Sequence, residues 1–196
     1  QHILNSETPG GVVPFVSLAR NDPDYTENGK YWRGSMWLPT AYVALKGLAA
    51  YGYFEDAHNS ALRIVEHMYK TYRDYDSNTI WECYHPERCE PARTTDGKKI
   101  VRKDFCGWSA LGPISVFIEF VLGFHTINAF EKTVKWAMPK DFKGKLGIKG
   151  LRFGDIVTDI IADGKDCFVA SNQEYTLEIN GKKYEICVGN NNYSIQ

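Results

Sequence analysis

The chain has 196 residues, 43% of them apolar and 24% charged, so it can bury a core and lacks the composition of a disordered, collagenous or membrane protein. Lysine and arginine number 23 against 24 aspartates and glutamates, and the net charge is −1. This balance argues against nucleic acid and membrane partners. Aromatic residues make up 14% of the chain. Rings in that number often line a sugar site, although most of them can equally belong to the core.

The first third of the chain predicts an irregular segment followed by two helices. Residues 1–34 contain turn sequences at Thr8-Pro9-Gly10-Gly11, Asn21-Asp22-Pro23-Asp24 and Glu27-Asn28-Gly29. Apolar residues then recur at helical spacing over 38–52, with Pro39 in the first turn. A second helix, with Glu55 in its first turn and Arg73 in its last, follows after a very short joint. The two helices must therefore be antiparallel neighbours.

The middle of the chain predicts a loop and then a buried helix. Residues 76–107 are rich in turn formers, whereas residues 108–124 are apolar on almost every side. With Pro113 and Glu119 inside it, the second segment falls short of a membrane span. Glu119 is either a second catalytic acid or, as a buried carboxylate, the partner of a buried arginine.

The last third of the chain alternates with the period of a β-strand. Strands are predicted at 133–138, 146–153, 156–162, 167–170, 175–179 and 182–188. Asp163-Gly164 and Asn180-Gly181 separate two pairs of these runs, as in tight hairpins. The chain is therefore predicted to be α+β, with a helical region over 1–125 and a small antiparallel sheet or sandwich over 126–196.

The five cysteines are too few for a disulfide scaffold and odd in number. Three of them, Cys83, Cys89 and Cys106, could close a tetrahedral zinc site with His85. The C-x-H-x3-C spacing is not a usual zinc pattern, so we expect inert or paired thiols, with no metal and no cofactor.

Three aromatic segments carry the candidate chemistry. Residues 31–37 read Tyr-Trp-Arg-Gly-Ser-Met-Trp, which suits a neutral polyhydroxyl ligand because rings pack on C–H faces and arginine donates several hydrogen bonds. The alternative is a structural cluster in which tryptophan packs in the core and arginine bonds a carbonyl. Residues 80–86 place Glu82 among aromatic residues, a setting that suits a general base. His85 is a rival base, although a histidine beside a proline is more often structural.

The third segment, residues 105–110, reads Phe-Cys-Gly-Trp-Ser-Ala at the start of the buried helix, and we expect it to line the same pocket. Together the three segments resemble the closing motifs of glycoside hydrolase family 63 and trehalase-like enzymes in order and rough spacing. The matching patterns are Tyr31-Trp32-Arg33-Gly34-x-x-Trp37, Trp81-Glu82-x-Tyr84-x-Pro86 and Phe105-x-x-Trp108-Ser109-Ala110. The likeness covers residues from about 8 to 124.

The resemblance implies a fold and an activity. That group, which includes processing α-glucosidases and mannosylglycerate hydrolases, consists of (α/α)6 toroids, so the chain would be the C-terminal portion of such an enzyme. Glu82 would be the general base of an inverting hydrolase, with an Asp general acid upstream of this chain. The sugar subsite would comprise Tyr31, Trp32, Arg33, Trp37, Trp81, Tyr84 and Trp108. Cys83 stands where relatives often carry asparagine. Without the acid, the isolated chain is expected to be inactive or nearly so.

Other functions stay open at this point. One is a non-catalytic carbohydrate-binding or structural fragment, in which Glu82 only bonds a sugar hydroxyl. Another is a sugar epimerase, which would require a histidine base, and His85 is the one histidine near the motifs. The expected partners are an oligosaccharide or glycoside substrate and the remainder of the enzyme chain. A periplasmic or secreted location is slightly favoured over a cytoplasmic one.

Overall fold

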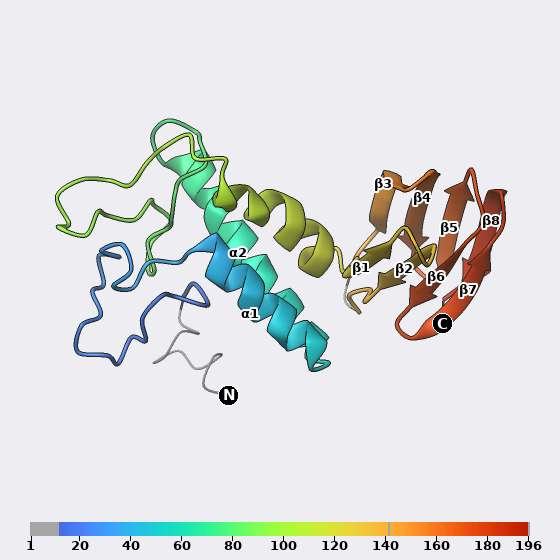
Figure 1. The fold of residues 1–196 in the computed structure, drawn as a ribbon, viewed down its shortest axis with the longest axis horizontal. Coiled ribbons are helices and arrows are strands. Elements are labelled where there is room, and N and C mark those ends of the chain that lie inside the picture. The colour runs from blue at the N-terminus through green and yellow to red at the C-terminus, as the bar shows by residue number, and fades with distance from the viewer. Residues whose placement is uncertain (1–11, 141, 196) are drawn as a thin grey trace. The chain divides into compact units, whose positions relative to one another are not determined.

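The computed structural model describes residues 12–140 and 142–195, and the chain divides into two units, Gln1–Phe120 and Val121–Gln196. The predicted turn at residues 8–11 lies outside the described residues. Helices occupy the first unit and all strands of the described residues lie in the second, which confirms the α+β prediction (Figure 1). No helix among the described residues is long and apolar enough to cross a membrane.

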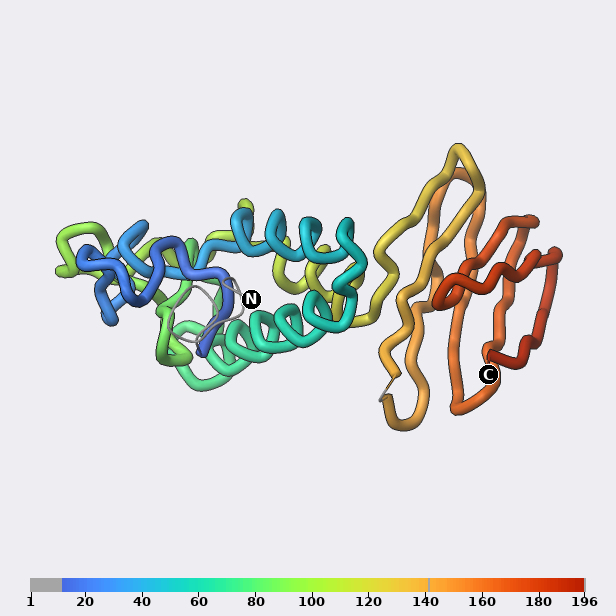
Figure 2. The backbone as a smooth tube through the Cα atoms, turned by 90° about the horizontal axis from the view of Figure 1, so that it is seen from below, coloured from blue at the N-terminus to red at the C-terminus, as the bar shows by residue number. Residues whose placement is uncertain are grey.

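Two antiparallel helices begin the regular structure of the first unit, as predicted. Helix α1 spans Leu38–Ala50 and helix α2 spans Phe54–Asp74, and the two run side by side in opposite directions (Figure 2). Leu38, Ala41 and Leu45 of α1 are buried. Gly52 supplies the positive φ of 83° that the short joint requires. The apolar face of α2, which includes Ala57, Ala61, Ile64 and Met68, is also buried.

The predicted helix over 108–124 is present but irregular and shorter. A 3₁₀ turn covers Trp108–Leu111 and a π-helix covers Gly112–Val121. The helix approaches α2 closely, since a Cβ on Gly112 would lie 2.2 Å from the sulfur of Met68. Glu119 accepts hydrogen bonds from Tyr42 at 2.8 Å and Lys46 at 3.0 Å, both on α1. Glu119 is therefore paired with a tyrosine and a lysine, and the predicted arginine partner is wrong.

The segment 76–107 is a loop, as predicted, but short bridge pairs hold it in place. Tyr84 pairs with Met36 on one side and Pro91 on the other, and Arg93 pairs with Lys30 and Ile100. These pairs hold the loop against the segment that leads into α1. Residues 31–37 and 81–86, far apart in sequence, therefore become neighbours.

The second unit contains eight strands in its described part, arranged as two four-stranded sheets. One sheet has the order β1-β2-β6-β7 and the other β3-β4-β5-β8. The strands are β1 Thr126–Asn128, β2 Thr133–Trp136, β3 Lys145–Phe153, β4 Ile156–Asp163, β5 Asp166–Ser171, β6 Tyr175–Ile179, β7 Lys182–Ile186 and β8 Gly189–Ser194. Buried residues alternate along β4 and β6, and Tyr175 of β6 bonds Thr158 of β4 at 3.1 Å. The inner faces of the two sheets therefore pack together as a sandwich.

The sandwich departs from the sequence prediction in two ways. Strands β1 and β8 were not predicted, because β1 has three residues and β8 reads Gly-Asn-Asn-Asn-Tyr-Ser, without apolar alternation. Pairing with β5 makes β8 a strand. The expectation of purely antiparallel pairing is wrong for β2 and β6, which pair in parallel. Strands β3 to β5 lie in the other sheet, so the chain crosses over and returns beside β2 in the same direction.

Gly123 generates a stability prediction for this unit. Its φ is 90°, and a Cβ there would lie 2.1 Å from the carbonyl oxygen of Ala137. We expect Gly123→Ala to lower the free energy of unfolding by roughly 3 kcal/mol, since both backbone strain and a clash result. The Trp136 indole N–H, which donates to Leu122 at 2.7 Å, gives an NMR signal for following urea unfolding.

The matched control is Gly164→Ala. Gly164 also has a positive φ, 62°, but no atom lies within 4 Å of the added Cβ. This change should cost only about 1 kcal/mol, the strain alone. Equal losses for the two variants would contradict the proposed clash at Gly123.

Candidate active site

The three aromatic segments meet at Glu82. The backbone groups of Met36 and Tyr84 exchange two hydrogen bonds of 3.0 Å, which join the first segment to the second. The Glu82 carbonyl accepts the Trp108 indole N–H at 3.0 Å and the Ser109 hydroxyl at 3.1 Å, which joins the third. All three segments are therefore held together by bonds at or beside a single residue.

The carboxylate of Glu82 is oriented but keeps acceptor capacity. The residue is buried, with 7% of its surface exposed. Oε1 accepts the Tyr31 hydroxyl at 3.0 Å, whereas Oε2 faces only the backbone N–H of Arg102 at the long distance of 3.5 Å. The backbone N–H of Glu82 donates to the Arg102 carbonyl at 3.0 Å. One carboxylate oxygen is therefore held, and the other has lone pairs with which it can take a proton.

Tyr31 supplies the bond to Oε1 in its neutral form. Burial, with the hydrogen bond to Glu82 and the charge of that residue as further causes, raises the pKa of the Tyr31 phenol above its ordinary value of 10.0. The hydroxyl therefore stays protonated and donates to the carboxylate.

Tryptophan rings surround this pair and differ in exposure. Trp32 stacks on Trp37 with centroids 4.1 Å apart and planes 4° apart, and the edge of Tyr31 meets Trp37 at 4.6 Å. Trp108 lies 5.9 Å from Trp37. Trp37 is 1% exposed, whereas Trp32 is 53% and Trp108 40% exposed. Trp37 is thus the buried centre of the cluster, and Trp32 and Trp108 offer the surfaces that a ligand can reach.

Three other residues of the predicted subsite have partners elsewhere. Arg33 is exposed and bonds the carboxylate of Asp24 at 3.1 Å. Trp81 is buried with its ring edge on Tyr75, and its indole nitrogen has no hydrogen-bond partner. Tyr84 is 1% exposed, and its hydroxyl accepts the backbone N–H of Trp81 at 3.3 Å. Trp81 and Tyr84 are therefore the buried side chains of the second segment, and they pack in the core of the first unit.

His85, the rival base, has its lone pair occupied. It is buried, and its Nδ1 accepts the backbone N–H groups of Glu87 at 3.0 Å and Arg88 at 3.1 Å. Burial, followed by the charge of Arg88, lowers the pKa of His85 to about 4. These bonds shape the turn after Pro86, so the geometry favours Glu82 as the base.

The cysteines do not gather. Within residues 12–140 and 142–195, no group of three or more histidine, cysteine or acidic side chains is placed to hold a metal ion. All five cysteines are free, with Cys83 and Cys167 buried. Burial raises the pKa of the Cys83 thiol, which therefore remains protonated beside Glu82.

Two residues that bond Glu82 had no role in the sequence prediction. Ser109 is fully buried and bonds the Glu82 carbonyl, and Arg102 contributes both of its backbone polar groups to Glu82. The position of Ser109 directly after Trp108 in the third motif was an available signal. Arg102 had none, because its backbone rather than its side chain makes the contacts.

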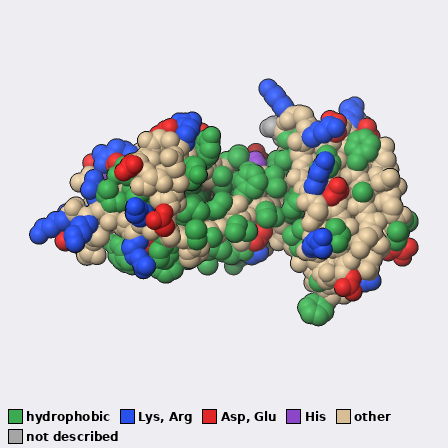
Figure 3. Space-filling view, turned by 90° about the horizontal axis from the view of Figure 1, so that it is seen from above, with side chains coloured by type: hydrophobic (Ala, Val, Ile, Leu, Met, Phe, Trp, Pro, Cys, Tyr) green, Lys and Arg blue, Asp and Glu red, His purple; other side chains and the backbone are tan. Residues whose placement is uncertain are grey.

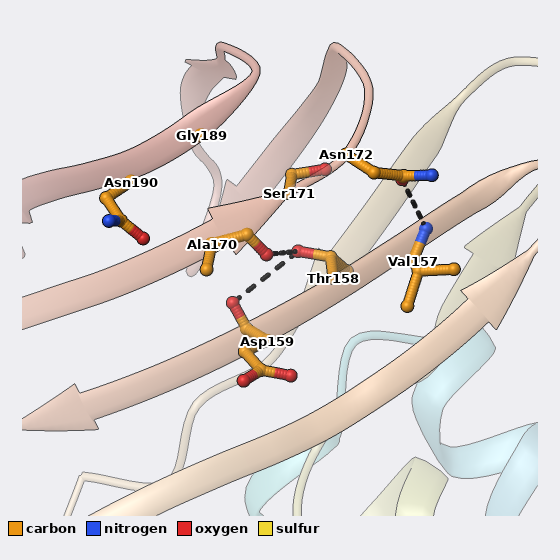
Figure 4. Close-up of a pocket in the computed structure, with 8 residues that line it drawn as sticks. All are labelled: Val157, Thr158, Asp159, Ala170, Ser171, Asn172, Gly189 and Asn190. Carbon is orange, nitrogen blue, oxygen red and sulfur yellow. Dashed lines mark hydrogen bonds between the residues drawn. The ribbon is translucent and has the colours of Figure 1, made fainter.

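A separate depression of about 340 Å³ lies in the second unit (Figure 4). It is lined by Val157, Thr158, Asp159, Ala170, Ser171, Asn172, Gly189 and Asn190. Several of its polar groups are already bonded: Thr158 donates to the Ala170 carbonyl at 3.0 Å, and the Asn172 side chain accepts the Val157 N–H at 2.7 Å. Asp159 accepts the Gly150 N–H at 2.6 Å. Several polar groups of the depression are therefore already bonded within the protein, which leaves fewer of them to bind a ligand.

The chain is similar to a known family and to two curated proteins. Residues 1–98 match the family described as mannosylglycerate hydrolase MGH1-like glycoside hydrolase domain. An uncharacterized protein of Borreliella burgdorferi is 29% identical over 178 aligned positions, and the match covers 87% of this chain and 37% of that protein. Alpha-glucosidase 2 of Arabidopsis thaliana is 28% identical over 109 aligned positions, and the match covers 50% of this chain and 13% of that protein.

Among solved structures, a putative kojibiose phosphorylase from human microbiome has a TM-score of 0.32 and 13% identity, over 44% of this chain and 12% of that one. That similarity is too low to carry a structural argument. The chain thus spans little more than a third of the length of the bacterial relative and about an eighth of that of the α-glucosidase.

The buried histidines generate a pH prediction. Burial lowers the pKa of both His67 and His85 to about 4. An unfolded chain protonates its histidines near pH 6.5, so between pH 6.5 and 4 the unfolded state binds more protons. Stability should be complete above pH 6.5 and fall progressively as the pH drops to 4. Urea unfolding at a series of pH values measures this.

The control for this dependence is His85→Asn, whose side-chain oxygen can still accept the two backbone N–H groups. It should reduce the slope of stability against pH across that window. A slope as steep as that of the unaltered chain would contradict the assignment to His85.

Proposed function

The chain belongs to the mannosylglycerate hydrolase MGH1-like glycoside hydrolase family, and from this we propose that it carries the general base and part of the sugar subsite of an inverting glycoside hydrolase. The observation that carries the proposal is the Glu82 carboxylate, buried and oriented at the meeting point of three segments. The 28% identity to an α-glucosidase supports an α-glucoside or a related glycoside as substrate.

In the proposed reaction Glu82 activates a water molecule. Oε2 takes a proton while the water oxygen bonds to the anomeric carbon on the face opposite the leaving group. The glycosidic C–O bond breaks, and a general acid protonates the leaving oxygen. The reaction ends with a protonated Glu82 and a sugar of inverted configuration. In inverting enzymes the two carboxyl groups stand roughly 6.5–9.5 Å apart, which leaves room for the water.

The acid and the rest of the sugar site are proposed to lie in a longer protein that contains this chain. The match to 37% of the bacterial relative supports this. So does the surface of the first unit, where hydrophobic side chains gather over the helices (Figure 3). Large apolar residues that are at least half exposed there include Val43, Tyr51, Tyr53, Tyr69 and Ile114. In this proposal, residues 1–125 belong to the catalytic toroid, whose other helices cover these residues, and 126–196 form an appended β unit.

The exposed rings supply the sugar contacts in this proposal. Trp32 and Trp108 present faces to solvent, and the C–H faces of a pyranose pack on such surfaces. Trp37 packs against both rings but is itself buried, so it does not contact the sugar in this proposal.

Glu82→Gln tests the base. In the longer protein we expect hydrolysis of α-glucosides or α-mannosides to fall about 10²- to 10⁴-fold, because glutamine cannot accept the proton. The measurement is release of free sugar, with the anomer of the product determined by NMR. Glu119→Gln is the matched control, because Glu119 bonds Tyr42 and Lys46 rather than residues of the site. Hydrolysis that survives in Glu82→Gln would refute the proposed base, and saturable binding without turnover would favour a carbohydrate-binding function.

Trp32→Ala tests the sugar surface. We expect KM to rise on the order of tenfold, which corresponds to about 1.4 kcal/mol of lost binding, while kcat changes less. Phe130→Ala removes an exposed ring of the second unit, outside the proposed toroid, and should leave KM unaltered. Equal KM values for Trp32→Ala and the unaltered protein would remove Trp32 from the subsite.

A further inference from the structure

Tyr31 makes a contact that a sugar-binding residue does not need. Its hydroxyl donates to Oε1 of Glu82 at 3.0 Å, although the two residues are 51 positions apart in the chain. A phenol has one O–H to donate, and here the carboxylate receives it. Toward a sugar, the same hydroxyl is left only as an acceptor.

The backbone of Tyr31 is held in an unusual conformation. Its φ of 56° lies in the left-handed region, which costs a non-glycine residue free energy. Several bonds keep it there: its N–H donates to the carbonyls of Gly29 and Arg93, both at 2.9 Å, and its carbonyl accepts the N–H of Ser35 at 3.2 Å. The indole N–H of Trp37 reaches the same carbonyl at 3.4 Å.

The ring of Tyr31 is also fixed. It meets the buried Trp37 edge to face at 4.6 Å with an angle of 88° between the planes. Backbone and ring together leave the hydroxyl little freedom except to point at Glu82. A strained backbone maintained by surrounding contacts is a common feature of catalytic sites.

We infer that Tyr31 is a positioning residue for the general base, orienting the Glu82 carboxylate, rather than a ligand of the sugar. This inference rests on the proposed function of Glu82. A hydrogen bond to Oε1 fixes the plane of the carboxylate, so that the lone pairs of Oε2 face a defined direction. Since Oε2 has only the 3.5 Å contact with Arg102, it is the oxygen left for the attacking water.

Tyr31→Phe removes the hydroxyl and keeps the ring that packs on Trp37. In the longer protein we expect kcat to fall roughly 10- to 100-fold with little change in KM, because a hydrogen bond to a charged group is lost. The matched control is Tyr42→Phe, which removes the hydroxyl bonded to Glu119 and should change neither quantity.

A second measurement needs no activity. The carbon-13 NMR signal of the Glu82 carboxyl in this chain is assigned with Glu82→Gln. At constant pH this signal should shift in Tyr31→Phe and stay in place in Tyr42→Phe, because only the first variant loses the hydrogen bond to that carboxylate.

The outcomes separate the two proposals. A raised KM with an unaltered kcat and an unaltered Glu82 carboxyl signal would make Tyr31 a sugar ligand and overturn the inference. Loss of the folded NMR spectrum in Tyr31→Phe would also overturn it, because the hydroxyl would then be needed for folding. Hydrolysis that survives Glu82→Gln would instead refute the proposed function, while the Glu82 carboxyl signal would still report on the hydrogen bond between Tyr31 and Glu82.

Discussion

The hydrogen bonds at Glu82 are the constraint on which the arrangement of the first unit depends. Its carbonyl takes two donors from the third segment, its N–H and one carboxylate oxygen meet the backbone of Arg102, and its other oxygen meets Tyr31. A buried carboxylate without such partners would be costly. The hydrogen bonds that partner the polar groups of Glu82 also hold the three aromatic segments together, although these segments form no regular sheet.

Within the tryptophan cluster, one ring is buried and two are exposed to solvent. Trp37 is buried at the first helix, where it carries the rings of Tyr31 and Trp32. The exposed rings can therefore be held rigidly without being buried themselves. A ring fixed by stacking loses little entropy when a ligand arrives, which is an advantage in a sugar site.

The sequence predicted most of the regular elements, whereas the contacts within the candidate site came from the tertiary structure. Periodicity located both antiparallel helices and six strands, because their apolar faces recur with the period of the element. It missed β8, whose asparagines form a strand only by pairing with β5, and it missed the parallel pairing of β2 with β6. Both depend on which strands become neighbours, and no local pattern records that.

The sequence by itself determined the chemical inventory: a glutamate among aromatic residues, the order of three motifs, and an α+β chain. Tertiary structure decided which of those groups act together. It paired Arg33 with Asp24, buried Trp81 and Tyr84, engaged the lone pair of His85 in a turn, and placed the Tyr31 hydroxyl on Glu82. The physical reason is that residue types and spacing specify local conformation, whereas hydrogen-bond partners and burial depend on contacts between residues distant in sequence.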